Sequence, residues 1–163
     1  MISKIYNIGK IITWDTDCDK ILINDNSQLE ILIENDTILQ IGQNLHSDNI
    51  EEEIDAKGGL VTPGFIDCHT HPIFLGSRSH EFELRTKGET YEDIAKQGGG
   101  IKYSIKKIRE SSKSQIFEEC LPRINSFLDK GTTTIEAKSG YGLTLDDEIK
   151  SLEVIKMLNE SSK

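Results

Sequence analysis

The stretch VTPGFIDCHTHPIFLGSR, residues 61–78, decides the fold of this chain and the place of its chemistry. Its apolar, β-branched start predicts a buried strand over residues 59–67. Two histidines one residue apart, His69 and His71, end that strand, and Pro72 terminates it. Side chains two apart on a strand point to the same face, so we expect both imidazoles to project together.

The sequence after this stretch alternates helical and strand patterns. Thr90 is expected to cap a short helix, Ser114 to cap a longer one, and Pro122 to kink or split that longer helix. A β-branched strand, TTTIEAK at residues 132–138, comes next, and a capping box that starts at Thr144 opens a last helix. This order implies a parallel sheet whose strands are connected by crossover helices. The sequence contains two such β/α units.

The sequence before residue 60 contains strands and turns instead. Short isoleucine-rich runs predict strands at residues 2–6, 10–14 and 28–33. An Asn35-Asp36 turn predicts that the third strand continues into a hairpin. Turn-forming residues cluster at 15–27 and 43–50, where we expect turns.

Composition and charge exclude several classes of partner. The formal net charge of −9 disfavours nucleic acid and anionic membranes, because both select basic patches. No apolar run approaches the roughly 20 residues of a transmembrane helix, and no targeting segment is expected at the N-terminus. The cysteines Cys18, Cys68 and Cys120 are odd in number and far apart, which indicates a reducing, cytoplasmic setting without disulfides. We expect Cys68 to be a core residue.

The pair His69 and His71 indicates a metal site. Imidazole suits Zn, Fe, Ni or Cu, and two imidazoles on one strand end supply two ligands in nearly fixed geometry. The alternative is a pair of ordinary polar residues at a strand end. A catalytic zinc usually has three protein ligands plus water, and the other histidines, His46 and His80, are not at matching strand ends. The sequence therefore predicts an incomplete site.

Two further side chains are candidates for substrate binding. Arg78 can grip a carboxylate with two parallel hydrogen bonds, and Gly76 would let the loop at 74–78 fold back over the metal. Tyr141 lies in a Ser-Gly-Tyr-Gly turn directly after the second strand, and loops that follow the strands of a β/α barrel share one face. Alternatively, Arg78 is a solvated surface residue, Tyr141 is a packed loop residue, and the nearby Lys138 contacts solvent or a carboxylate.

The sequence GLVTPGFIDCHTHP resembles the first barrel strand of the amidohydrolase superfamily, which ends in two histidines one residue apart. Over about residues 58–160 the sequence resembles the imidazolonepropionase family. Three segments carry this resemblance: HTHPIFLGSRSHEFELR, YEDIAKQGGGI and TTTIEAKSGYGLTLDDEIKSL. The resemblance implies an α/β fold with two domains. Residues 1–58 would supply strands of a small, incomplete β-sandwich, and residues 59–163 would form the first two β/α units of an incomplete TIM-like barrel.

The resemblance also implies roles for the candidate residues. His69 and His71 would be the first two ligands of one zinc or iron ion. Arg78 would bind the propanoate carboxylate of a small anionic substrate, and Tyr141 and Tyr91 would contact that substrate. The implied reaction is the opening of 4-imidazolone-5-propanoate to N-formimidoyl-L-glutamate in histidine degradation, by a metal-activated water. The remaining ligands and the general base are expected beyond this chain, so the resemblance assigns no catalytic base here.

The sequence contains two β/α units, whereas a complete barrel needs about 250 residues. We therefore expect this chain to be the N-terminal piece of such an enzyme and to be inactive alone. A C-terminal half chain or a homo-oligomer would complete it. Two other interpretations stay open. Another amidohydrolase, such as an aminohydrolase of purines or pyrimidines, would have no substrate carboxylate for Arg78 to bind. A non-catalytic remnant would need a second chain to cover its open sheet edge.

Overall fold

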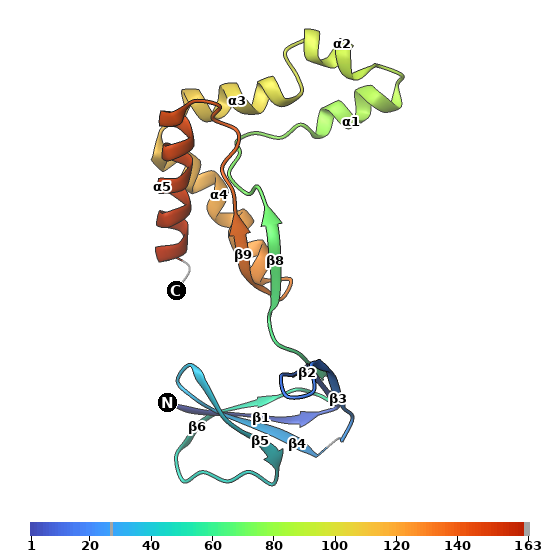
Figure 1. Cartoon of the computed structure of the whole chain (residues 1–163), viewed down its shortest axis with the longest axis vertical. Coiled ribbons are helices and arrows are strands. Elements are labelled where there is room, and N and C mark those ends of the chain that lie inside the picture. The colour runs from blue at the N-terminus through green and yellow to red at the C-terminus, as the bar shows by residue number, and fades with distance from the viewer. Residues whose placement is uncertain (27, 162–163) are drawn as a thin grey trace. The chain divides into compact units, whose positions relative to one another are not determined.

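The computed structural model describes residues 1–26 and 28–161, and the chain divides into two compact units, Met1–Pro63 and Gly64–Lys163 (Figure 1). The regular elements described in the first unit are all strands, and those in the second are helices and two strands. None of the helices in these described residues combines the length and the apolar character that crossing a bilayer requires.

The first unit consists of two small sheets with strand orders β5-β4-β1-β6 and β3-β2-β7. Its strands are β1 (Ile2–Ile8), β2 (Lys10–Asp15), β3 (Lys20–Asn24), β4 (Leu29–Glu34), β5 (Thr37–Gln43), β6 (Ile50–Asp55) and β7 (Leu60–Val61). β1 pairs antiparallel with β4 and parallel with β6. Ile8 and Ile31 from one sheet and Ile11 from the other are buried in one cluster, so the two sheets share a core.

The hairpin predicted at Asn35-Asp36 is confirmed. β4 and β5 pair antiparallel, and Glu34 lies opposite Thr37 across the two-residue turn. Asn35 has a φ of 51°, a left-handed conformation that asparagine adopts more easily than most residues and that tight hairpin turns need. Its backbone N–H donates to the Met1 carbonyl at 2.9 Å, which ties the turn to the start of β1.

The turns predicted at residues 15–27 and 43–50 are present at residues 16–19 and 48–49. β6 begins only at Ile50, but β3 occupies residues 20–24, so the first range also contains a strand that was not predicted. β3 pairs with β2 around a turn in which the Asp15 carboxylate accepts hydrogen bonds from the N–H groups of Asp17 and Cys18. Every residue of β3 is exposed, so the strand lacks the alternation of buried and exposed positions by which a sequence reveals strands.

The second unit is a mixed α/β unit built on a parallel strand pair. Its elements are β8 (Phe65–Thr70), α1 (Ser79–Thr86), α2 (Tyr91–Lys96), α3 (Ile101–Glu110), α4 (Lys113–Leu128), β9 (Thr132–Ala137) and α5 (Leu145–Ser161). β8 and β9 are parallel, with Phe65 opposite Thr132 and Thr70 opposite Ala137, which confirms the predicted β/α order. α4 and α5 lie beside the strand pair, whereas α1 and α2 lie away from it (Figure 1).

The strand predicted at residues 59–67 has different bounds in the structure. It is divided into β7, in the first unit, and β8, in the second, with Pro63 between them. β8 continues to Thr70, so His69 lies inside the strand and His71 lies directly after it. Proline has no backbone N–H to donate to a sheet, which explains the interruption.

β8 is exposed, whereas the sequence predicts a buried strand. The exposed fractions of Phe65 and Ile66 are 58% and 73%. Cys68, predicted to be a core residue, is exposed as well. The reason is that β8 pairs with β9 alone among the described strands, and a two-stranded sheet leaves most of its surface uncovered.

Helix α4 is continuous, which corrects two expectations, the cap at Ser114 and a split at Pro122. Ser112, rather than Ser114, caps it, because the Ser112 hydroxyl accepts from the Gln115 N–H and the Gln115 side chain accepts from the Ser112 N–H. Pro122 lies inside the helix without splitting it. The fixed φ of proline fits a helix, although proline has no N–H to donate to the carbonyl one turn earlier.

The core of the second unit joins the helices to the loop that follows β8. Its fully buried members are Ile73, Leu75, Ile108, Ile116, Cys120, Val154 and Leu158. Ile73 and Leu75 belong to the segment between His71 and Arg78. This segment is therefore part of the hydrophobic core.

Candidate functional site

The two predicted metal ligands lie side by side at the carboxyl end of β8. The ring centroids of His69 and His71 are 5.5 Å apart, with an angle of 62° between the ring planes. Both side chains are exposed. The backbone N–H of His69 donates to the Asp67 carboxylate at 3.2 Å. The end of β8 therefore presents two accessible imidazoles.

The spacing of these imidazoles fits one metal ion. Two imidazoles bound to a tetrahedral zinc at about 2.0–2.1 Å have ring centroids about 5 Å apart, and the observed 5.5 Å is close to that separation. Within the described residues, no group of three or more His, Cys, Asp or Glu side chains lies close enough to hold a metal ion. The two imidazoles are thus the candidate metal ligands that the described chain brings together.

The loop after β9 brings Tyr141 to the histidine pair. The ends of the two strands are joined by hydrogen bonds from the Lys138 N–H to the Thr70 carbonyl at 2.9 Å and from the Thr70 hydroxyl to the Glu136 carbonyl at 2.7 Å. The Tyr141 ring lies 6.1 Å from the His71 ring and 6.4 Å from the Phe74 ring, centroid to centroid. Parallel strands therefore place both loops at the same end of the pair.

Arg78 and Tyr141 line one pocket. This pocket has a volume of about 200 Å³ and is lined by Phe74, Gly76, Arg78, Ser104 and Tyr141. Arg78 is the N-cap residue of α1 and is exposed. Its guanidinium makes no hydrogen bond or ion pair with the residues that the structure describes. A positive charge beside an aromatic wall is suited to a small anionic ligand.

The other candidates lie elsewhere. Tyr91 is the first residue of α2, is 62% exposed and packs near Gly100, so it is separate from the pocket of Arg78 and Tyr141. The Lys138 ammonium group lies 3.8 Å from the Glu136 carboxylate, which matches the prediction that this lysine contacts solvent or a carboxylate. The structure therefore places His69 beside His71, His71 beside Tyr141, and Tyr141 in the same pocket as Arg78. Tyr91 is not part of this group.

Two charged residues that the sequence did not reveal hold the loop of Tyr141. Glu148 accepts hydrogen bonds from the N–H groups of Gly142 and Leu143 at 2.8 and 2.7 Å, both at Oε1. Arg109 Nε donates to the Gly142 carbonyl at 2.8 Å. A sequence signal for this contact exists, because Glu148 lies in the acidic first turn of α5. Acidic side chains at a helix N-terminus often accept hydrogen bonds from backbone N–H groups that lack a partner within the helix.

The environment of Glu148 favours its charged form. Burial by itself raises the pKa of this carboxyl, but hydrogen bonds from Ser139 and from the backbone of the loop outweigh burial, and the pKa is lowered. Leu143 has a φ of 57°, which is uncommon for a branched side chain. A charged carboxylate thus holds the loop in a backbone conformation that it would seldom adopt alone.

Comparison with known proteins assigns the chain to a family. A family model described as "Amidohydrolase family" matches residues 52–108, which include both histidines and Arg78. The imidazolonepropionase of Vibrio vulnificus (strain CMCP6) is 53% identical over 109 residues, 67% of this chain and 27% of that protein. The imidazolonepropionase of Aeromonas hydrophila is 56% identical over 107 residues, 66% of this chain and 26% of that protein. The chain belongs to the amidohydrolase family. The resemblance to imidazolonepropionases found in the sequence is thereby confirmed.

This amidohydrolase chain matches about a quarter of the length of those relatives, 27% and 26%. Among solved structures, a triazine hydrolase from Arthobacter aurescens is similar with a TM-score of 0.56 at 21% identity, over 97% of this chain and 34% of the other. Likeness at that identity concerns the fold alone. It agrees with a mixed α/β chain of amidohydrolase type.

Proposed function

We propose that this chain is part of an imidazolonepropionase, which hydrolyses 4-imidazolone-5-propanoate to N-formimidoyl-L-glutamate. One observation carries the proposal: a pocket that contains Arg78 and Tyr141 lies next to a pair of exposed imidazoles, in a chain 53% identical to an imidazolonepropionase. The substrate has a carboxylate on a short tail and a ring amide to be opened. A cationic pocket beside candidate metal ligands suits both features.

Each residue then has a defined task. His69 and His71 hold a zinc or iron ion, whose chemistry when bound is to make hydroxide available near neutral pH. Arg78 binds the propanoate carboxylate with parallel hydrogen bonds and fixes the orientation of the ring. Tyr141 forms the wall between the arginine and the imidazoles, at 6.1 Å from His71, and limits where the ring lies. Tyr91 has a weaker place in this scheme, because it is exposed on α2.

We further propose that β8 and β9 are the first two strands of a β/α barrel and that the strands of the first unit belong to a β-sandwich. The parallel pairing of β8 with β9, and the position of both loops after strand ends, support the barrel. The missing ligands and the general base would come from further β/α units, supplied by another segment or another chain.

Substitution of Arg78 tests the substrate. In the protein made from the complete reading frame that contains this chain, Arg78→Met should lower kcat/KM for imidazolonepropanoate at least about tenfold, because a hydrogen bond to a charged group contributes about 1.5–3 kcal/mol. Arg85→Met is the matched control, since Arg85 is an exposed arginine in the last turn of the same helix. It should leave the reaction within about twofold of the wild type.

The alternative activity gives a different result. An aminohydrolase of neutral purines or pyrimidines has no substrate carboxylate, so its rate would not depend on Arg78. Turnover of such a base by the metal-replete protein, equal in the wild type and in Arg78→Met and without hydrolysis of imidazolonepropanoate, would refute the proposed function. Residues 1–163 alone should be inactive, and turnover by them would contradict the need for further ligands.

A further inference from the structure

The segment between His71 and Arg78 is packed along most of its length. Residues 72–76, here called the strap, contain two core side chains, Ile73 and Leu75, which are 2% and 5% exposed. Both belong to the cluster that includes Ile116 and Cys120 of α4. The strap therefore lies against α4. The expectation that Gly76 lets this loop fold back over a metal stays a prediction.

Arg123 of α4 fixes the first part of the strap. Its Nη1 atom donates to the Pro72 carbonyl at 2.5 Å and to the Phe74 carbonyl at 3.2 Å. Its guanidinium carbon lies 3.5 Å from the centroid of the Phe74 ring, a cation–π distance. One side chain thus holds two carbonyls and one ring of the strap. Phe74 is also the residue that contacts Tyr141, at 6.4 Å between ring centroids.

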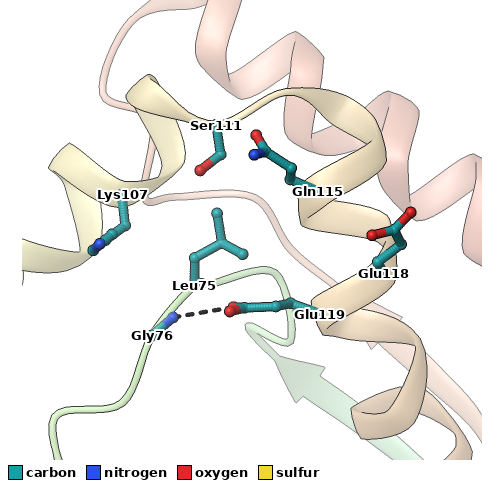
Figure 2. A pocket seen from close by; sticks show the side chains of 7 residues that line it. All are labelled: Leu75, Gly76, Lys107, Ser111, Gln115, Glu118 and Glu119. Carbon is teal, nitrogen blue, oxygen red and sulfur yellow. Dashed lines mark hydrogen bonds between the residues drawn. The ribbon is translucent and has the colours of Figure 1, made fainter.

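The second part of the strap is held from α4 and α3. The Gly76 N–H donates to Glu119 Oε2 at 3.2 Å, and Figure 2 shows Glu119 reaching from α4 to that N–H. On its other side, the Tyr103 hydroxyl occupies the space beside Gly76, since a Cβ atom there would lie 2.7 Å from it. Gly76 has a φ of 71°, so glycine is required both for the backbone and for the space.

We propose that Arg123 is a positioning residue that makes the strap a fixed spacer between the imidazoles at the end of β8 and the carboxylate-binding Arg78. A spacer of fixed length sets the distance between the two ends of the substrate, and so selects the length of its acidic side chain. The planar guanidinium is suited to this task, because it donates in a fixed fork and stacks on an aromatic ring at once, which lysine does not do. The substrate part of this proposal rests on the proposed function; the structural part does not.

Amide hydrogen exchange in residues 1–163 tests the structural part. Arg123→Met should speed the exchange of the N–H groups of residues 74–78, among which that of Gly76 donates to Glu119, about tenfold or more, because the strap opens more often without its two carbonyl bonds to Arg123 and the ring contact. The matched control is Arg109→Met, which removes a comparable bond to the Gly142 carbonyl. The control should speed exchange near residues 142–143 and leave residues 74–78 unchanged. Unchanged exchange of residues 74–78 in Arg123→Met overturns the proposal.

A conservative variant keeps the test decisive. Where Arg123→Met loses the helical circular dichroism of the chain, Arg123→Lys replaces it, since lysine keeps the charge and one donor but not the fork. Arg123→Lys should retain the helical signal and still speed exchange of residues 74–78 several-fold. If Arg123→Lys has the helical signal of the wild type and also its exchange rates at residues 74–78, the fork geometry is not needed. That result would overturn the role given to Arg123.

Kinetics of the complete protein test the substrate part. Arg123→Lys should raise KM for imidazolonepropanoate about fivefold or more with kcat changed less than about twofold, and should reduce the preference for propanoate over the acetate homologue. Arg85→Met serves again as the control. An unchanged preference would overturn length selection. If the wild type does not hydrolyse imidazolonepropanoate at all, the proposed function fails, while hydrogen exchange still decides whether Arg123 fixes the strap.

Discussion

Gly140 lies directly against the imidazole ring of His71. A Cβ atom at position 140 would be 3.3 Å from both Cε1 and Nδ1 of that ring, closer than ordinary van der Waals contact. Gly140 also has a φ of 144°, a backbone conformation that other residues rarely adopt. Glycine at this position therefore lets the loop after β9 close over the end of β8. The contact between Tyr141 and His71 depends on that close approach.

Substitution of Gly140 should disturb His71 selectively. Gly140→Ala is expected to destabilise the second unit by about 1–2 kcal/mol through backbone strain and to displace the His71 ring. Gly88→Ala is the control, because Gly88 has a φ of 98° but no atom within 4 Å of a Cβ there. NMR spectra of residues 1–163 should show shifted His71 ring resonances in Gly140→Ala and unshifted ones in Gly88→Ala. Equal shifts in the two variants would contradict a direct contact.

The histidine pair should bind zinc weakly in residues 1–163. Complete structural zinc sites contribute about 10–16 kcal/mol, so half of the ligands should give roughly 5–8 kcal/mol, which is a Kd between about 1 μM and 0.2 mM. His71→Ala should weaken binding by about tenfold or more. His80→Ala is the control, since His80 is an exposed histidine on α1. Calorimetric titration that finds the same affinity in His71→Ala as in the wild type would exclude His71 as a ligand.

Local chemistry in the sequence predicted several element ends correctly. Thr90 and Asp93 form a capping box at the start of α2, and Thr144 accepts from the Asp147 N–H at the start of α5, as side chains of these types do at helix N-termini. α1 was not predicted. Its one buried residue is Glu81, whose carboxylate accepts from the Gly100 N–H at 2.7 Å, so no apolar stripe marks the helix.

In the candidate site too, the sequence predicts residues that follow a recognisable pattern and misses residues that do not. His71 and Tyr141 were candidates because each follows a strand end, and parallel strands bring such positions together whatever lies between them. Arg78 was a candidate because a guanidinium suits a carboxylate and because of the family resemblance. Arg123 and Glu148 were missed because their partners are backbone groups of distant loops, at Pro72 and Phe74 for one and at Gly142 and Leu143 for the other. Any residue offers a backbone group, so no residue type in the sequence signals such a contact.

Glu148 should make the stability of the second unit depend on pH. Its pKa is lowered in the folded chain, so its contribution is fully present above the ordinary glutamate pKa of about 4.3 and is lost as the pH falls through the lowered value. At neutral pH, Glu148→Gln should reduce the free energy of unfolding by about 1–2 kcal/mol, because two hydrogen bonds lose their charged acceptor. The difference between variant and wild type should shrink in acid.

Urea unfolding followed by helical circular dichroism measures this effect, because every helix that the structure describes lies in the second unit. Glu160→Gln is the control, since Glu160 is an exposed glutamate on the same helix, α5. The control should change stability by less than about 0.5 kcal/mol at any pH. A Glu148→Gln deficit that is as large in acid as at neutral pH would contradict a role for the charge.

Pro122 should cost α4 stability that alanine would restore. Pro122→Ala supplies an N–H for the Glu118 carbonyl one turn earlier and removes the ring from the helix interior, so the second unit should gain about 1–2 kcal/mol. Trp14 is the single tryptophan and lies in the first unit, so its fluorescence reports that unit while helical circular dichroism reports the second. The helical transition should move to higher urea and the fluorescence transition should stay in place. A helical transition that moves to lower urea would mean that the ring packs favourably where it lies and that α4 is shaped around it.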